Sequence, residues 1–305
     1  MGGGALGRTV IAVSAFRSDA SVLALLERIF AEGGAEAAAV IVVDSLNDGP
    51  LAHAIADRGW PVRYENAVVN LGSAGNLARR LQLAGEVPGA RWCFALNHDG
   101  MFSREFVEKL ADYGERAERV GAVFPRRIMT DRGNSVLRPH RHVFATPRFG
   151  ASDDPPREVA WDSSNGALYA LAPIRQGLLP WAELWMGWED LAFGWQLEKH
   201  GWRQLYCADA EYLDDYEYAR VSLWGRQLFI TRKPAWYAYY VVRNLLLIIR
   251  RTGGGPAAWR FFAERFGREL LFTLLFRSEK RRRLRLLWRG LADGLRGAAG
   301  QGRNL

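Results

Sequence analysis

Short apolar runs and segments with helical spacing alternate along the first hundred residues. The runs are rich in β-branched residues and several end in turn formers, which is typical of buried strands. The expected strands are residues 10–13, 39–43, 62–65 and 92–96, and the expected helices are residues 21–31, 51–58 and a segment that ends near residue 83. This alternation predicts an α/β fold with right-handed crossovers, a mostly parallel central sheet and helices on both faces.

The pattern changes after residue 99, where loops rich in Pro, Gly and Arg separate shorter runs. The expected strands here are residues 122–124, 143–145 and 167–171. An exposed turn is expected at 151–156, and a helix over 190–200 that Gly201 ends.

Polar clusters follow three of the expected strands, at Asp44, at residues 70–76 and at residues 97–99. In open α/β sheets, ligands bind outside the carboxyl ends of the strands. The sequence therefore predicts that one edge of the sheet gathers the three clusters in one cleft.

Composition narrows the class of protein. The chain has 305 residues, 49% of them hydrophobic and 24% charged, with a mean hydropathy of −0.15. These values exclude a disordered chain, a collagen-like repeat and a polytopic membrane protein. The two cysteines, Cys93 and Cys207, match neither a disulfide framework nor a zinc motif, which favours a reducing compartment. No signal peptide is expected, and Arg243 and Asn244 interrupt the most apolar stretch, residues 235–249, so no spanning helix is expected either.

Charge is distributed unevenly along the chain. Residues 225–305 carry 18 basic and 4 acidic side chains, a net charge of +14, whereas residues 1–224 carry a net charge of −6. Over residues 259–276, aromatic residues and leucines recur beside arginines at helical spacing, and a basic run follows at 280–283. The pattern predicts a helix that lies in an anionic membrane interface. The alternatives are a helix docked on the body with a solvated basic face, and a tail that binds nucleic acid.

The first candidate functional residues are Asn97 and Asp99, which lie two residues apart and offer side-chain oxygens as metal ligands. Such a pair in a turn suits Mg²⁺ or Mn²⁺, although an Asp at a strand end also commonly forms only local hydrogen bonds. His98 and His200 are expected to be surface or cleft histidines rather than ligands.

A second acidic feature, Glu189-Asp190, opens the expected helix after Trp188. One interpretation is a carboxylate that accepts a proton from a hydroxyl nucleophile, beside a tryptophan on which a ring stacks. The other is ordinary capping of the helix N-terminus. Upstream, the loop at 72–76 enters a helix with N–H groups suited to a pyrophosphate, but it matches neither the Rossmann nor the P-loop motif.

Taken in order, these stretches resemble family 2 glycosyltransferases of the GT-A fold, especially the rhamnosyltransferase-like and galactofuranosyltransferase-like branch. The similar segments are VIVVDS at 40–45, NLGSAGN at 70–76, LNHD at 96–99, SNGA at 164–167, WEDLAF at 188–193, YYVVRN at 239–244 and RGLADG at 289–294. The resemblance covers roughly residues 8–297, and it is the order and spacing of these loose motifs that is specific.

The resemblance implies a nucleotide-sugar donor, a divalent metal and an inverting displacement. By position, Asp44 corresponds to the residue that reads the base of the nucleotide, Asp99 to the last Asp of the metal-binding Asp-x-Asp motif, and Asp190 to the general base. The residues implied to bind the donor are Ser14, Phe16, Asp44, Gly72, Asn76, Asn97, Asp99 and Trp188. The implied catalytic residues are Asp190 and Glu189, and the implied metal ligands are Asp99 and Asn97.

The chain departs from the family pattern at three places. Asn97 replaces the first Asp of the metal motif, and the first strand ends in an unusual Ser14-Ala15-Phe16-Arg17. The branch often has a metal-binding His some two dozen residues beyond the base, where this chain instead has Asp214 and Asp215 as the available substitutes.

The expected protein is an inverting glycosyltransferase that uses dTDP-rhamnose, UDP-galactofuranose or another UDP-hexose and acts on a glycan or lipid-linked acceptor in cell-surface polysaccharide synthesis. We expect a catalytic domain over 8–224, with a nucleotide half at about 8–100 and an acceptor half at about 101–224, and a basic helical region over 225–305. It is expected to be cytoplasmic and peripheral on the membrane, with no nucleic-acid partner. The alternatives are a non-catalytic sugar-nucleotide or glycan-binding protein of the same fold, and a basic nucleic-acid-binding protein.

Overall fold

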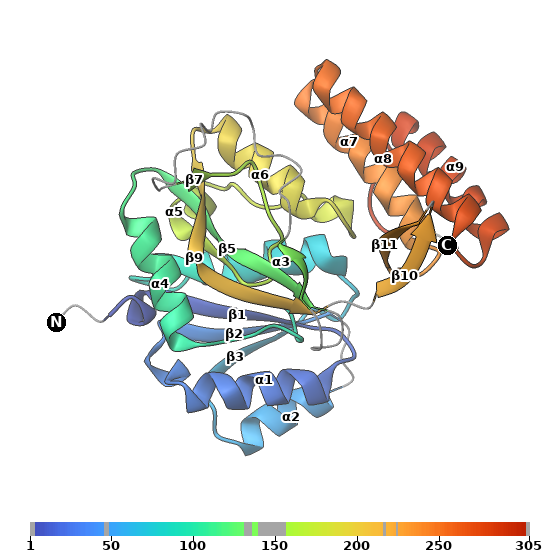
Figure 1. Ribbon diagram of the computed structural model, residues 1–305. Helices are drawn as coiled ribbons and strands as arrows, with labels where there is room; N and C mark the ends of the chain where they lie inside the picture. The colour runs from blue at the N-terminus through green and yellow to red at the C-terminus, as the bar shows by residue number, and fades with distance from the viewer. Residues whose placement is uncertain are drawn as a thin grey trace.

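The computed structural model describes residues 4–45, 49–130, 136–139, 157–215, 218–223 and 225–302. The strands of its main sheet are β1 (Thr9–Ala15), β2 (Ala39–Asp44), β3 (Val62–Asn66), β4 (Trp92–Leu96), β5 (Val120–Thr130), β6 (Val136–Pro139), β7 (Arg157–Glu158), β8 (Ala167–Ala170) and β9 (Arg203–Asp215). Within the described residues these nine strands lie in the order β3-β2-β1-β4-β8-β5-β9-β7, with β6 beside β5 (Figure 1).

The sheet is mostly parallel, as the alternating pattern predicts. β1 pairs in parallel with β2 and β4, β2 with β3, and β5 with β9, whereas β8 runs antiparallel between β4 and β5. The four strands expected in the first half are all present, at or within two residues of their predicted ends. The expected strand at 143–145 and the expected turn at 151–156 lie outside the described residues.

Helices cover both faces of the sheet. One layer contains α1 (Asp19–Ala31), α2 (Pro50–Asp57) and α4 (Arg104–Glu115), and the other contains α3 (Gly72–Gly85), α5 (Leu171–Arg175) and α6 (Glu189–Lys199). The side chains of β1 alternate between the layers, because successive residues of a strand point to opposite faces. Ile11 and Val13 pack in the core of the first layer, whereas Val10 and Ala12 pack in the core of the second.

Two long elements of the body, α4 and β9, are absent from the sequence-based expectations. The helix α4 carries Val107, Leu110 and Ala111 at helical spacing, and all three are fully buried. The periodic signal is therefore present there. The strand β9 is different, because its partner β5 is some eighty residues earlier in the chain and its pairing is set by tertiary structure.

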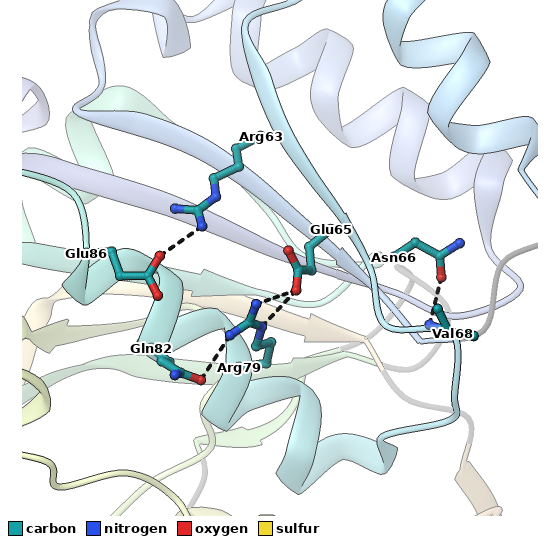
Figure 2. Close-up of polar contacts among 7 residues, drawn as sticks. All are labelled: Arg63, Glu65, Asn66, Val68, Arg79, Gln82 and Glu86. Carbon is teal, nitrogen blue, oxygen red and sulfur yellow. Dashed lines mark hydrogen bonds and ion pairs between the residues drawn. The ribbon is translucent and has the colours of Figure 1, made fainter.

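The edge strand β3 is tied to α3 by charged side chains (Figure 2). Arg63 donates to Glu86 at 2.8 Å, and Arg79 donates from Nε to Glu65 at 2.9 Å. Beyond the end of β3, the N–H of Val68 donates to the Asn66 side chain at 2.8 Å. Charged residues on an edge strand oppose pairing with a second chain, so β3 ends the sheet.

The C-terminal part forms a hairpin and three helices. The hairpin strands are β10 (Tyr218–Leu223) and β11 (Arg226–Thr231), and the helices are α7 (Tyr237–Thr252), α8 (Pro256–Leu275) and α9 (Lys280–Arg296). In Figure 1, β1–β3 run toward the side of the molecule on which these helices lie. The expected domain boundary after residue 224 stays a prediction; in the chain it falls between the bounds of β10 and β11.

The helix α7 packs on the body rather than standing apart from it. Its residues Leu245 and Ile248 share a buried cluster with Ala74 of α3 and Leu191 of α6. Arg243 and Asn244, the polar pair within the apolar stretch, are 1% and 0% exposed. Among the described helices we find none with the length and apolar composition that a membrane span requires.

Candidate active site

The site lies where β1 and β4 end. Ser14, the second-last residue of β1, donates from its hydroxyl to the side-chain oxygen of Asn97 at 3.3 Å. Asn97 follows β4 directly, and its N–H donates to the side-chain oxygen of Asn165 at 2.9 Å. Two residues further, Asp99 is exposed in a turn that the N–H of Gly100 closes on the Asn97 carbonyl.

The loop before β8 is held from behind by buried polar groups. Tyr212 of β9 donates from its hydroxyl to the Asn165 side chain at 3.1 Å and accepts the N–H of Met101 at the same distance. Arg127 of β5 pairs with Asp162 at 3.2 Å, both side chains being 2% exposed. The Arg127 guanidinium also donates to the Asn165 carbonyl at 2.6 Å. These contacts therefore hold the backbone N–H groups of this loop in a fixed position.

One of those N–H groups meets the candidate base. Asp190, in the first turn of α6, accepts the N–H of Ser164 at 3.2 Å. Asp190 is half-buried, whereas Glu189 beside it is 7% exposed. Burial, together with the charge of Glu189, raises the pKa of Asp190 to about 8. Burial also raises the pKa of Glu189, partly offset by a hydrogen bond with Ser73 of α3.

A buried arginine lies behind these carboxylates. Arg80 of α3 is 3% exposed and donates to the carbonyl of Ala12 at 3.1 Å and to that of Leu96 at 2.8 Å. Burial lowers its pKa to about 10, opposed in part by Asp190 and Glu189. Arg80 is therefore cationic at neutral pH, and it joins the ends of β1 and β4 to the helix that faces them.

The loop before α6 has an unusual backbone. Trp185, Gly187 and Trp188 have φ values of 61°, 80° and 67°, in the left-handed region. Gly72, at the start of α3, fits against this loop, because a Cβ on Gly72 would lie 2.0 Å from the Trp185 carbonyl oxygen. The N–H of Ala74 donates to the same oxygen at 3.2 Å, and the N–H of Gly72 donates to Asn70.

The 72–76 loop, which is predicted to contact the donor, also makes contacts within the protein. The N–H groups of Gly72 and Ala74, expected to face a pyrophosphate, already have acceptors within the protein. Asn76 is also turned inward: it is 4% exposed, and its Nδ2 donates to the Val43 carbonyl at 2.9 Å and to Ser45 at 3.0 Å. The loop thus joins α3 to the end of β2 and to the Trp185 segment.

Three further predicted donor residues have distinct surroundings. Asp44 ends β2, is 1% exposed and accepts the Tyr64 hydroxyl at 2.8 Å. Phe16 is exposed, with the Arg17 guanidinium 5.3 Å from the centre of its ring. Trp188 is half-buried, and its ring packs on Phe261 of α8. Trp188 therefore packs between the loop and the C-terminal helices, and its contact with the donor stays a prediction.

Several candidate ligands are not gathered at the site. His200 is exposed at the end of α6, where its Nδ1 lies 2.8 Å from the Gln196 carbonyl. Cys93 and Cys207 are buried free thiols. Asp214 and Asp215 are in β9, and their side chains lie outside the described part of the chain.

The described residues contain no cluster of three or more His, Cys, Asp or Glu side chains arranged for a metal ion. What they offer at the strand ends is the exposed carboxylate of Asp99, with the Asn97 amide oxygen two residues before it. Mg²⁺ commonly keeps several waters and is held by one or two carboxylates and substrate phosphates. These residues fit a metal of that kind, and do not fit one held by the protein alone.

Sequence reasoning missed the residues that connect the site. Ser164 and Asn165 lie in a segment that the family resemblance marked, but neither was assigned a role. Asn244 ends a segment that the resemblance also marked and interrupts an apolar stretch, but it was assigned no role, and Arg80 and Tyr212 carried no signal that distinguishes them from ordinary helix or strand residues. Their function depends on partners far away in the sequence.

Three solved structures show which fold this is. A fragment of TarS from S. aureus in complex with UDP is 15% identical, with a TM-score of 0.58 over 90% of this chain and 77% of that one. The mannosyltransferase PcManGT from Pyrobaculum calidifontis, in complex with GDP-Man and Mn²⁺, is 14% identical, with a TM-score of 0.56 over 94% and 87%. GalNAc-T7 with UDP, GalNAc and Mn²⁺ is 11% identical, with a TM-score of 0.59 over 94% and 56%.

No protein-family model and no curated protein sequence matches the chain. The likeness is therefore one of structure at low identity, and it extends over nine tenths or more of the chain in each case. The chain has the GT-A glycosyltransferase fold.

Proposed function

We propose that this protein is an inverting glycosyltransferase that moves a sugar from a nucleoside diphosphate to an acceptor hydroxyl. The observation that carries the proposal is the position of Asp190, bonded to the N–H of Ser164 beside the ends of β1 and β4. Asp190, a half-buried residue, thereby lies next to the sheet edge at which parallel α/β folds bind their ligands. The structural neighbours with UDP or GDP-Man support a nucleotide-sugar donor.

In the proposed reaction, Asp190 accepts the proton of the acceptor hydroxyl. The hydroxyl oxygen attacks the anomeric carbon from the face opposite the diphosphate, and the bond from that carbon to the diphosphate oxygen breaks, which inverts the configuration. The electron pair leaves on the nucleoside diphosphate. The N–H of Ser164 fixes the orientation of the Asp190 carboxylate, while Glu189 is buried and ties α6 to α3 through Ser73.

The donor is proposed to lie along the residues at the strand ends. The predicted residues with exposed or half-buried side chains there are Ser14, Phe16, Asn97 and Asp99, and the buried Asp44 ends the neighbouring strand β2. A divalent metal, Mg²⁺ or Mn²⁺, would be held by Asp99 and Asn97 together with the pyrophosphate. It would supply positive charge to the departing diphosphate.

We propose that the donor is dTDP-rhamnose or a UDP-hexose and that the acceptor is a glycan or a lipid-linked glycan of cell-surface polysaccharide synthesis. The motifs that resemble family 2 glycosyltransferases support both proposals.

We further propose that the C-terminal helices rest on the cytoplasmic face of an anionic membrane. Exposed large apolar residues lie on α8 and α9, namely Trp259, Leu271, Leu274, Leu275, Trp288 and Leu295. Exposed basic residues accompany them, including Arg268, Arg281 and Arg285.

The test is thermal stability with a panel of UDP- and dTDP-sugars, with and without Mn²⁺, followed by a transfer assay with the donor that binds. A ligand of the folded state raises the unfolding midpoint once its concentration exceeds its Kd. A midpoint shift and release of the nucleoside diphosphate with one donor support the proposal. Binding without release in the presence of acceptor glycans would instead favour a sugar-nucleotide-binding protein of the same fold, which Asn97 in place of an acidic metal ligand also favours.

A further inference from the structure

We propose that Asn244 of α7 is a positioning residue for Asp190: its buried amide holds residues 184–187, which lead into the start of α6, in the conformation that places the carboxylate. The inference rests on the proposed function, because it treats Asp190 as the base. It adds that the C-terminal helices are part of the catalytic machinery as well as a candidate membrane contact.

The amide of Asn244 has several partners at once. Its Nδ2 lies within hydrogen-bond distance of three carbonyls, of Leu184 at 3.0 Å, of Met186 at 2.8 Å and of Gly187 at 2.8 Å, which share its two hydrogens. Its Oδ1 accepts the Nε of Arg243 at 2.8 Å. Asn244 is 0% exposed, so within this structure it is these groups, not water, that surround the amide.

The segment that Asn244 contacts has an unfavourable backbone conformation, which other parts of the protein must stabilise. Two tryptophans, Trp185 and Trp188, have left-handed φ values, and Gly187 lies between them with φ 80°. Bulky residues in this region persist only when the surrounding structure imposes the conformation. Two residues after Gly187, α6 begins at Glu189, with Asp190 next in its first turn. The path of the loop therefore sets the start of the helix and the place of its carboxylates.

Other parts of the same helices hold the loop as well. The Nη2 of Arg243 donates to the Leu184 carbonyl at 2.8 Å, and the indole N–H of Trp188 donates to the Val241 carbonyl of α7 at 3.0 Å. The Trp188 ring packs edge-on against Phe261 of α8, with ring centres 5.8 Å apart. On the opposite side, Asp190 is held by Ser164 of the body. The position of the Asp190 carboxylate thus depends on a hydrogen bond from the GT-A body and on the contacts that the C-terminal helices make with the loop before α6.

The contact requires a hydrogen-bond donor at position 244, which the side-chain amide of asparagine provides. Three carbonyl oxygens converge on one side-chain nitrogen, and a carbonyl can only accept a hydrogen bond. A leucine at position 244 would remove this donor from the Met186 and Gly187 carbonyls, whereas the Leu184 carbonyl would keep the Nη2 of Arg243. A shorter side chain, as in Asn244→Ala, makes room for water to donate instead, and it would keep the fold while loosening the loop.

The matched control is Gln204, which also uses a buried amide to hold α6. Gln204 is 3% exposed, and its Nε2 donates to the carbonyls of Ala160 at 2.6 Å and of Gly194 at 2.9 Å. Gly194 lies in the middle of the helix rather than at its start. A Gln204→Ala variant therefore removes a similar buried amide without touching residues 184–188.

The experiment measures kcat, the donor KM and the acid side of the pH–rate profile for the wild type, Asn244→Ala, Asn244→Leu and Gln204→Ala. With Asn244→Ala we expect kcat to fall at least tenfold, the donor KM to stay within about twofold, and the apparent pKa of the acid side to fall as water reaches Asp190. Gln204→Ala should lower the unfolding midpoint without shifting that pKa. An Asn244→Ala enzyme with the wild-type kcat and pH profile would overturn the proposal.

The pH readout is specific because the neighbours of Asp190 are known. The charged and titratable groups that face it are Glu189 of α6, Arg127 of β5, Asp162 before β8, Tyr169 of β8, Arg80 of α3 and Tyr237 of α7. Neither substitution alters any of them, so a shifted profile reports a changed position or hydration of the carboxylate.

A second readout does not need activity. Carboxyl ¹³C titration of Asp190 and hydrogen exchange over residues 184–190 are followed in the donor-free protein. With Asn244→Ala we expect a lower pKa for Asp190 and at least tenfold faster exchange in that segment, neither of which Gln204→Ala produces. If the wild type transfers no sugar but Asn244→Ala shows these changes, the proposed function fails, while the inference that Asn244 positions the loop is supported. If transfer is normal and neither change occurs, the inference alone fails.

Discussion

At the scale of single residues, Asp190 combines two properties that oppose each other. Its place in the first turn of α6 favours the ionised carboxylate, because the N-terminus of a helix is positive. Burial and the neighbouring Glu189 favour the protonated form and raise its pKa to about 8. A base with a pKa near the working pH accepts a proton readily while still being partly ionised.

The first prediction concerns Asp190→Asn. Transfer should fall by about 10²–10⁴-fold, the usual contribution of a general base, while donor binding is retained. Asp99→Asn is the companion variant, and it should weaken donor binding in the presence of metal rather than abolish proton transfer. Calorimetric titration of the donor and a product assay separate the two. An Asp190→Asn enzyme with full activity would remove the base assignment.

The raised pKa of Asp190 also predicts how stability depends on pH. The folded protein keeps a proton on Asp190 that the unfolded chain releases above its ordinary pKa of 3.8, so this group lowers stability as pH rises from about 4 to about 8. Asp190→Asn cannot ionise. Its unfolding midpoint should therefore exceed that of the wild type at pH 8, and the difference should shrink toward pH 4. Equal midpoints at pH 8 would contradict the raised pKa.

Activity should depend on pH through the same group. Because Asp190 must be ionised to accept a proton, kcat/KM is expected to rise with pH up to about 8 and then level off. The profile is measured between pH 6 and 9.5, within the range over which the circular dichroism spectrum is constant. A rate that is already maximal at pH 6 would assign the proton transfer to a different group.

At the scale of elements, the site depends on the contact between the start of α3 and the loop before α6. Gly72 allows this contact because it has φ 65° and lies against the Trp185 carbonyl. The same approach brings Ser73 to Glu189 and Ala74 to the Trp185 carbonyl. The helix that is predicted to bind pyrophosphate thus also supports the carboxylates.

Gly72→Ala tests this contact, with Gly89→Ala as the matched control. Both glycines have left-handed φ values, 65° and 73°, but a Cβ on Gly72 would overlap the Trp185 carbonyl, whereas a Cβ on Gly89 would meet nothing within 4 Å. The unfavourable backbone conformation costs about 1–2 kcal/mol in either variant. We expect Gly72→Ala to lose clearly more unfolding free energy in urea, and to lose activity as well. Equal losses of unfolding free energy in the two variants would contradict this expectation, because the Trp185 segment would then move at little cost to accommodate the added Cβ.

At the scale of the whole molecule, the C-terminal helices have two faces with different properties. The inner face of α7 is buried against α3 and α6, and Gly290 of α9 lies against the backbone of Tyr239. The outer surface of α8 and α9 exposes apolar and basic side chains. Deleting α9 would therefore uncover α7, so surface substitutions test membrane binding better than truncation.

The last prediction uses such substitutions. Replacing Leu271, Leu274 and Leu275 of α8 by serine should reduce sedimentation with vesicles rich in anionic lipid several-fold, because membrane affinity depends on the apolar area that is inserted. Leu213→Ser, an exposed leucine of β9, is the control and should bind like the wild type. Unchanged vesicle binding by the α8 variant would contradict the membrane proposal, while transfer to a soluble acceptor should be unaffected in both.

The sequence by itself determined the parallel half of the sheet, since each buried strand and each amphipathic helix carries a local periodic signal. It also indicated which polar groups follow the strands, and those at Asp44 and Asn97 do lie at one edge of the sheet. Local pattern is sufficient there because period and turn chemistry act over a few residues.

Only the tertiary structure decided how the polar groups are used. Asn76 and Gly72, expected at the donor, face inward, and Trp188 packs on the C-terminal helices. Asn244, an interruption in an apolar helix when seen in the sequence, bonds to carbonyls nearly sixty residues away. Hydrogen bonds between distant segments depend on where the packed helices bring the backbone, and no local pattern encodes that position.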